Sequence, residues 1–115
     1  MFSKTLAFAA LSAVSVAMAQ IVGTVTLAPY TPSTIQCGIN TCPISGEWVS
    51  VNQTFFNSYG CGTLVRLTTT DGTHTTVAPV CDVCSTCTES FFEVPFVVLG
   101  ELGGGSAELT VNYDI

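Results

Sequence analysis

The hydrophobic residues of this 115-residue chain fall into one long run near the start and several short, interrupted runs after it. The long run, residues 6–16, follows Lys4 and precedes Ala17-Met18-Ala19. A basic start, a short apolar segment and a small-x-small site are the parts of a secretory signal peptide. The run is also too short to span a bilayer of about 30 Å as a helix. The pattern predicts a signal peptide over residues 1–19 and an exported domain over residues 20–115.

The rest of the chain alternates short β-branched runs with Gly, Pro, Asn and Asp, and it has almost no helical periodicity. Residues 62–68 alternate polar and apolar side chains, as a half-buried strand does. Asp71-Gly72 follows shortly after and is a two-residue hairpin signal. Together these patterns predict five strands, at residues 23–27, 48–51, 62–68, 73–80 and 107–113.

Turn-forming residues mark the segments between these strands. Residues 28–33 are expected to form a loop, because proline cannot donate to a ladder. Asn52 is expected to cap a short turn. Residues 96–102 predict one short helix, with Pro95 at its start, where a missing N–H costs nothing. Many short strands with one brief helix favour a closed β-barrel, which leaves no exposed strand edge.

The size and charge of the exported part limit its partners. Removing 19 of the 115 residues leaves 96, which is one domain with a modest core. Lys4 leaves with the signal, so Arg66 is the one fixed positive charge against eight acidic residues, a formal charge of −7. A nucleic-acid binder needs basic residues to displace counterions, and an anionic membrane or pectin would repel this chain. Neutral polymers such as glucans or chitin, or a basic protein, remain as partners.

All cysteines of the chain lie in the exported part, at positions 37, 42, 61, 81, 84 and 87. In an oxidising compartment this even number predicts three disulfides. The spacing Cys81-x-x-Cys84-x-x-Cys87 also suits zinc, but exported thiols oxidise unless a metal arrives first, so neither a metal nor another cofactor is expected. A Cys–His catalytic pair would need a free thiol, and the lone His74 is expected at the surface.

Four short motifs occur in order along this part of the chain: Trp48-Val49-Ser50-Val51-Asn52 with a Phe soon after, Cys61-Gly62, Asp82-x-Cys84-x-x-Cys87, and Gly105-x-x-x-Leu109-x-Val111-x-Tyr113. This pattern resembles the RlpA-like, barwin and expansin group, most of all its small single-domain fungal secreted members. The resemblance covers residues 23–115 and is most specific over residues 49–87. It implies a mainly β, disulfide-stapled, six-stranded double-psi β-barrel with one short helix. It also implies a groove in which relatives bind or loosen cell-wall polysaccharide.

The resemblance places four residues of this chain along the groove as ligand-binding candidates: Thr26, Tyr30, Asp82 and Glu93. Tyr30 and Tyr59 are expected to be exposed aromatic platforms for sugar rings. Glycoside hydrolysis needs two carboxyls flanking the scissile bond, roughly 5–9.5 Å apart, and Asp82 and Glu93 are the candidates for this pair. Alternatively, Asp82 accepts backbone N–H groups and Glu93 is solvated.

Departures from the family pattern bear on activity. The family's Asp-Leu-Ser element reads Glu93-Val94-Pro95 here, Leu27 replaces a family aromatic, and the Trp-Asp-Cys motif of the endoglucanases on this barrel is missing. The expected function is therefore a secreted, non-enzymatic protein of the extracellular space or cell wall that binds polysaccharide without hydrolysing it. One alternative is an inhibitor or effector that binds another protein, for example a cysteine protease. The other is a weak glycoside hydrolase or lytic enzyme.

Two covalent modifications are also predicted. The small family members typically keep four of the six cysteines and lack counterparts of Cys42 and Cys81, which are therefore expected to bond to each other. The pairing of the other four cysteines is left open. Asn52-Gln53-Thr54 fits the sequon for N-linked glycosylation and makes Asn52 a candidate acceptor.

Overall fold

A computed structural model describes residues 21–32, 34–38 and 40–115. The predicted signal peptide, residues 1–19, lies outside the described residues. Within the described ranges, no helix has both the length and the apolar character needed to cross a membrane.

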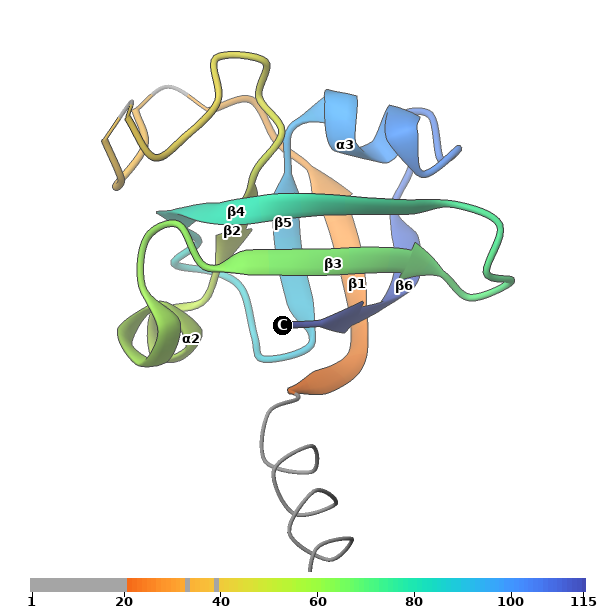
Figure 1. Cartoon of the computed structure of the whole chain (residues 1–115), viewed down its shortest axis with the longest axis horizontal. Coiled ribbons are helices and arrows are strands. Elements are labelled where there is room, and N and C mark those ends of the chain that lie inside the picture. The colour runs from red at the N-terminus through yellow and green to blue at the C-terminus, as the bar shows by residue number, and fades with distance from the viewer. Residues whose placement is uncertain (1–20, 33, 39) are drawn as a thin grey trace, which may run out of the picture.

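Six strands close into a barrel in the order β1-β5-β2-β4-β3-β6 (Figure 1). Two of the pairings, β1 with β5 and β2 with β4, are parallel, and the others are antiparallel. The strand bounds are β1 Val22–Pro29, β2 Val49–Val51, β3 Leu64–Thr69, β4 Thr75–Val83, β5 Phe91–Val94 and β6 Leu109–Asp114. The expected mainly β, six-stranded barrel is therefore confirmed, and its topology is consistent with a double-psi barrel.

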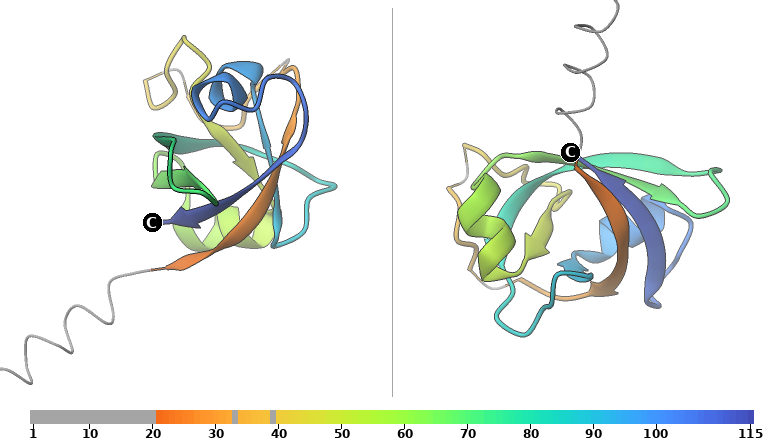
Figure 2. Two further views of the ribbon diagram at one scale, coloured as in Figure 1. Left: turned by 90° about the vertical axis from the view of Figure 1, so that its right-hand side faces the viewer. Right: turned by 90° about the horizontal axis from the view of Figure 1, so that it is seen from below.

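The barrel interior is filled by the apolar positions of the alternating strands. In β3, Val65 and Leu67 are fully buried, while Leu64 before them and Arg66 between them are exposed. The same alternation in the other strands adds valines, Leu27 and Phe92 to one core cluster. Figure 2 shows from the side and from below how the strands wrap around this core.

Two short helices close the ends of the barrel, where one was expected. The helix α2, Gln53–Tyr59, begins after Asn52, whose Oδ1 accepts a hydrogen bond from the backbone N–H of Phe55 at 2.8 Å. This is the predicted cap, but it starts a full helix instead of a turn because the following residues continue the i→i−4 bonds. The helix α3, Phe96–Glu101, follows Pro95 as predicted.

The parallel pair of β1 and β5 departs from the sequence prediction. Pro29 was expected in a loop, yet it ends β1 in register with Val94. Pairing between β1 and β6 stops at Leu27, and it is the N–H of Tyr30, the next residue, that donates to the Val94 carbonyl at 3.0 Å. The missing N–H of Pro29 therefore faces a side where no strand pairs, so proline is tolerated there. The strand β5 was not predicted, because its four residues do not alternate in polarity.

The turn between β3 and β4 is longer than the predicted two-residue hairpin. The N–H of Thr69 donates to the His74 carbonyl at 3.0 Å, which leaves residues 70–73 as the loop. Asp71 holds this loop, because its Oδ1 accepts from the Thr69 hydroxyl at 2.7 Å and from the Thr73 backbone N–H at 3.0 Å. His74 is exposed, as predicted.

Candidate functional site

Three neighbouring strands each contribute one polar side chain to a single cross-strand row. Ser50 of β2 is in register with Asp82 of β4 on one side and with Glu93 of β5 on the other. Residues opposite each other on paired strands point to the same face of a sheet. Val49 and Val51, which flank Ser50, point into the core. The row of Asp82, Ser50 and Glu93, called the acidic row below, therefore lies on the outer face of the barrel.

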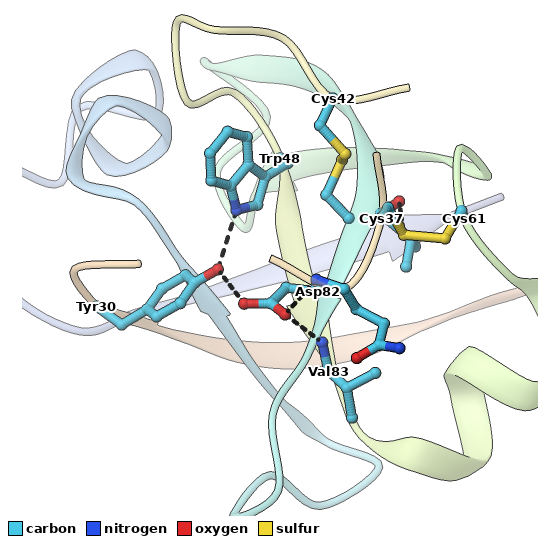
Figure 3. The surroundings of a disulfide bond; sticks show 10 residues. Tyr30, Cys37, Cys42, Trp48, Cys61, Asp82 and Val83 are labelled. Atoms are coloured by element: carbon cyan, nitrogen blue, oxygen red, sulfur yellow. Dashed lines mark hydrogen bonds between the residues drawn. A yellow bond between two sulfur atoms is a disulfide. The ribbon is translucent and has the colours of Figure 1, made fainter. Parts of the chain in front are cut away.

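A chain of hydrogen bonds reaches this row from Trp48 through Tyr30 (Figure 3). The Nε1–H of Trp48 donates to the Tyr30 hydroxyl at 3.0 Å, and that hydroxyl donates to Asp82 Oδ2 at 3.0 Å. Burial raises the pKa of Tyr30 to about 12, and the nearby negative charge of Asp82 adds to the effect. Tyr30 is half-buried, and its hydroxyl is occupied by these two bonds. Tyr30 is therefore less exposed than expected, because its hydroxyl turns inward to complete this chain of hydrogen bonds, and its role as a platform for a sugar ring stays a prediction.

Asp82 is held from its other oxygen as well. Its Oδ1 accepts the backbone N–H of Gln36 at 3.1 Å and that of Val83 at 3.0 Å. Together with Tyr30, three donors thus hold one carboxylate. The bond to Gln36 fastens the segment that follows β1 to the end of β4. This is the backbone-acceptor role that the sequence offered as the alternative to catalysis.

Glu93 and Ser50 keep unused hydrogen-bonding capacity. The carboxyl of Glu93 is half-buried, and burial, followed by the charge of Asp82, raises its pKa. Ser50 is 1% exposed, and its Oγ has no hydrogen-bond partner among the described residues. That Oγ lies near the Tyr30 hydroxyl without meeting it at good hydrogen-bond geometry. The row therefore contains Asp82, whose carboxylate is hydrogen-bonded within the protein, and Glu93, whose carboxyl holds its proton to higher pH than usual.

Thr26 stands apart from this cluster. It lies on β1 two residues before Ala28, which is in register with Glu93. Alternation along β1 puts Thr26 on the outer face together with Ala28. Its backbone N–H donates to the Ser90 carbonyl at 3.0 Å. The structure thus brings together Tyr30, Asp82 and Glu93, and it places Thr26 one step further along the same face.

Trp48 and Ser50 belong to the cluster, although the sequence argument had not assigned them to it. Trp48 is 9% exposed. A buried indole N–H needs an acceptor, and this requirement could have pointed to a polar neighbour. No comparable signal identified Ser50, because a serine within an apolar strand motif does not by itself indicate a binding site.

The two cavities described for this structure lie away from the acidic row. One, of about 340 Å³, is on the outer face of β1, β3 and β6 and is lined by Arg66, Thr68 and Asn112 among others. The other, of about 220 Å³, lies beside α2 and includes Asn52, Tyr59 and Tyr113. Neither cavity includes a residue of the acidic row, in which Ser50 is buried and the two acidic residues are half-buried.

Two of the three disulfides tie the segment before β2 to the rest of the barrel, and the third closes a short loop between β4 and β5. They join Cys37 to Cys61, Cys42 to Cys81 and Cys84 to Cys87. The bond between Cys42 and Cys81 confirms the predicted pairing, and Figure 3 shows it beside Asp82, the residue that follows Cys81.

The sulfurs of Cys84 and Cys87 and a carboxylate oxygen of Glu93 lie within 4.8 Å of one another, a spacing that could hold a metal ion. The two sulfurs are bonded to each other, however, and offer no thiolate ligand.

No protein-family model matches the chain, and no curated protein matches it. Solved structures do resemble it. The apo expansin of Clavibacter michiganensis superposes with a TM-score of 0.66 at 20% identity, covering 81% of this chain and 49% of that one. A mutant of the same expansin in complex with cellohexaose gives a TM-score of 0.60 at 21% identity, with the same coverage. The fold is therefore an expansin-like β-barrel, and the chain spans about half the length of these expansins.

Proposed function

We propose that this chain is a secreted protein that binds a neutral cell-wall polysaccharide, a glucan or chitin, along the acidic row and Tyr30, and that it does not hydrolyse it. The fold supports this proposal, since the expansin that it resembles has been solved with cellohexaose. The three disulfides and the apolar run at the start of the chain support export.

The observation that carries the non-hydrolytic part of the proposal is the bonding of Asp82. A glycosidase needs one carboxylate free to act as nucleophile or base opposite a protonated acid. Asp82 receives three hydrogen bonds from the protein, and using its lone pairs for chemistry would release both Tyr30 and the segment around Gln36. Glu93 has the raised pKa of an acid, but its neighbouring carboxylate is committed to structure.

Glu93 instead suits binding. A carboxyl with a raised pKa can donate a hydrogen bond to a sugar hydroxyl when protonated and accept one when ionised. Losing a single such bond costs about 1 kcal/mol, or about fivefold in affinity. The formal charge of −7 after signal removal also favours a neutral ligand, because an anionic polymer would be repelled.

The test is a pull-down of the purified exported protein on cellulose, chitin and β-glucan, with released reducing sugar measured in the same tubes. We expect retention on at least one polymer, no sugar above the blank, and little change between low and physiological salt. Glu93→Ala should weaken retention about fivefold. Glu89→Ala, which removes an exposed carboxyl away from the row, should not.

Three results would count against the proposal. Retention by none of the polymers would remove the binding function. Retention that falls steeply with salt would indicate an electrostatic partner such as a basic protein. Sugar release that disappears in both Asp82→Asn and Glu93→Gln would show that the row is a hydrolytic site.

A further inference from the structure

The disulfide between Cys84 and Cys87 differs from the other two in the length of chain that it closes. Its cysteines are three positions apart in the sequence, against 24 for Cys37–Cys61 and 39 for Cys42–Cys81. The entropic stabilisation given by a disulfide grows with the length of its loop. The barrel therefore depends least on this bond and can stay folded when it opens.

One cysteine of this bond is partly exposed and the other is buried. Cys84 is 4% exposed, whereas Cys87 is half-buried in the segment between β4 and β5. The sheltered Cys84 is held from its backbone, because its N–H donates to the Val51 carbonyl at 2.7 Å. An external thiol would therefore reach Cys87 first and leave Cys84 as the departing sulfur.

A proton donor stands beside this departing sulfur. A carboxyl oxygen of Glu93 lies within 4.8 Å of both sulfurs, close enough for proton transfer through one water or a small side-chain rotation. Burial and the charge of Asp82 raise the pKa of Glu93, so it holds its proton to higher pH than usual. The Thr86 hydroxyl lies 3.6 Å from the Cys84 sulfur and can stabilise a thiolate there.

The nearby carboxyl of Glu93 also distinguishes the Cys84–Cys87 disulfide from the Cys37–Cys61 disulfide. Cys61 is exposed, so exposure alone would not distinguish the two disulfides. The only group of three or more potential metal-ligand residues that the described residues bring together joins Cys84, Cys87 and Glu93.

We propose that Cys84–Cys87 is a redox-active disulfide that exchanges with external dithiols, with Glu93 as the proton donor to Cys84. A thiolate of the dithiol attacks the sulfur of Cys87, the bond between the two cysteines breaks, and its electron pair passes to Cys84, which takes the proton of Glu93. The second thiolate of the dithiol then attacks the other sulfur of the dithiol, which is bonded to Cys87 in the mixed disulfide, and releases Cys87. The dithiol is oxidised to a disulfide, and its two protons end, by way of Glu93 and solvent, on two reduced cysteines. This activity goes beyond polysaccharide binding and does not depend on it.

The first test maps which disulfide opens. The folded exported protein is titrated with dithiothreitol without denaturant, quenched in acid, alkylated and digested for peptide mapping. We expect a two-thiol species alkylated at Cys84 and Cys87 to accumulate before any other cysteine is modified. First modification at another pair, or appearance of all six thiols together, would overturn the proposal.

The second test addresses Glu93 through a pH profile. The rate of reduction of Cys84–Cys87, divided by the thiolate concentration of the reductant, should fall in the wild type as the pH rises through the Glu93 titration. In Glu93→Gln this profile should be flat and the rate at acidic pH about tenfold lower. Asp82 is the titratable group whose charge acts on Glu93, and it remains in the variant. Glu89→Gln is the matched control and should behave as the wild type. An unchanged rate and profile in Glu93→Gln would remove the proton-donor role.

Discussion

Tyr30→Phe tests the chain of hydrogen bonds that builds the candidate site. The substitution removes one hydroxyl and keeps the ring. Two bonds of 3.0 Å are lost together, one from the Trp48 indole and one to Asp82. Trp48 is 9% exposed, so its N–H is left without an acceptor in a place that water reaches poorly.

The expected cost follows from these two partners. An unsatisfied buried donor costs about 1–3 kcal/mol, and the upper half of this range applies when the environment is dry. Asp82 keeps its two backbone donors and is half-buried, so water can replace part of what Tyr30 supplied. We expect a loss of about 2 kcal/mol in the free energy of unfolding. For a domain of this size that lowers Tm by about 8–16 °C.

The assay is urea unfolding followed by circular dichroism, with the fluorescence of Trp48, the sole tryptophan of the chain, as a second probe. Tyr59→Phe is the matched control. Its hydroxyl has no hydrogen-bond partner among the described residues, so the change should stay within about 0.5 kcal/mol. A Tyr30→Phe variant as stable as this control would show that the two hydrogen bonds of the Tyr30 hydroxyl do not stabilise the fold. An alkaline titration adds a check, because the wild type should show one tyrosine with a pKa of about 12 that the variant lacks.

Three further predictions concern stability. Hydrogen bonds, the first from the Thr73 backbone N–H, lower the pKa of Asp71 from its usual 3.8 to about 2. The stability that the ionised Asp71 provides is therefore present above pH 3.8 and is lost as the pH falls towards 2. Urea unfolding across this window should show a smaller loss of stability in Asp71→Asn than in the wild type. The raised pKa of Glu93 has the opposite effect on stability, because it penalises the folded state once the pH rises above the pKa that Glu93 has in the unfolded chain. Glu93→Gln should therefore be more stable than the wild type at neutral pH but not at pH 3. Equal stability of the two proteins at both pH values would show that burial of Glu93 does not penalise the folded state. Replacing Cys42 and Cys81 together with Ala should cost about 4 kcal/mol, because their bond spans 39 positions; calorimetry measures it, and a loss below about 1 kcal/mol would show that the loop is ordered without the disulfide.

Local sequence signals were enough for much of the fold. The alternation in residues 62–68 corresponds to β3, because a strand with one face in the core must alternate. Asn52 and Pro95 mark the starts of both helices, since capping depends on residues that lie next to each other in the chain. The four-residue β5 carried no such signal, and the register of Pro29 depended on where β6 stops pairing.

The features of the candidate site likewise fall into those that the sequence indicated and those that depend on the fold. The prediction of export, the acidic charge, the even cysteine count and the candidates Tyr30, Asp82 and Glu93 all came from reading the amino-acid sequence and its family resemblance. The fold of the barrel brought Tyr30 to Asp82, 52 positions away, and set Ser50 between the two carboxyls. It also placed Glu93 beside the Cys84–Cys87 bond. Ser50 lies between the carboxyls because β2 pairs with both β4 and β5, and the Tyr30–Asp82 bond spans these strands from the end of β1. Local sequence patterns do not encode which distant strands will pair.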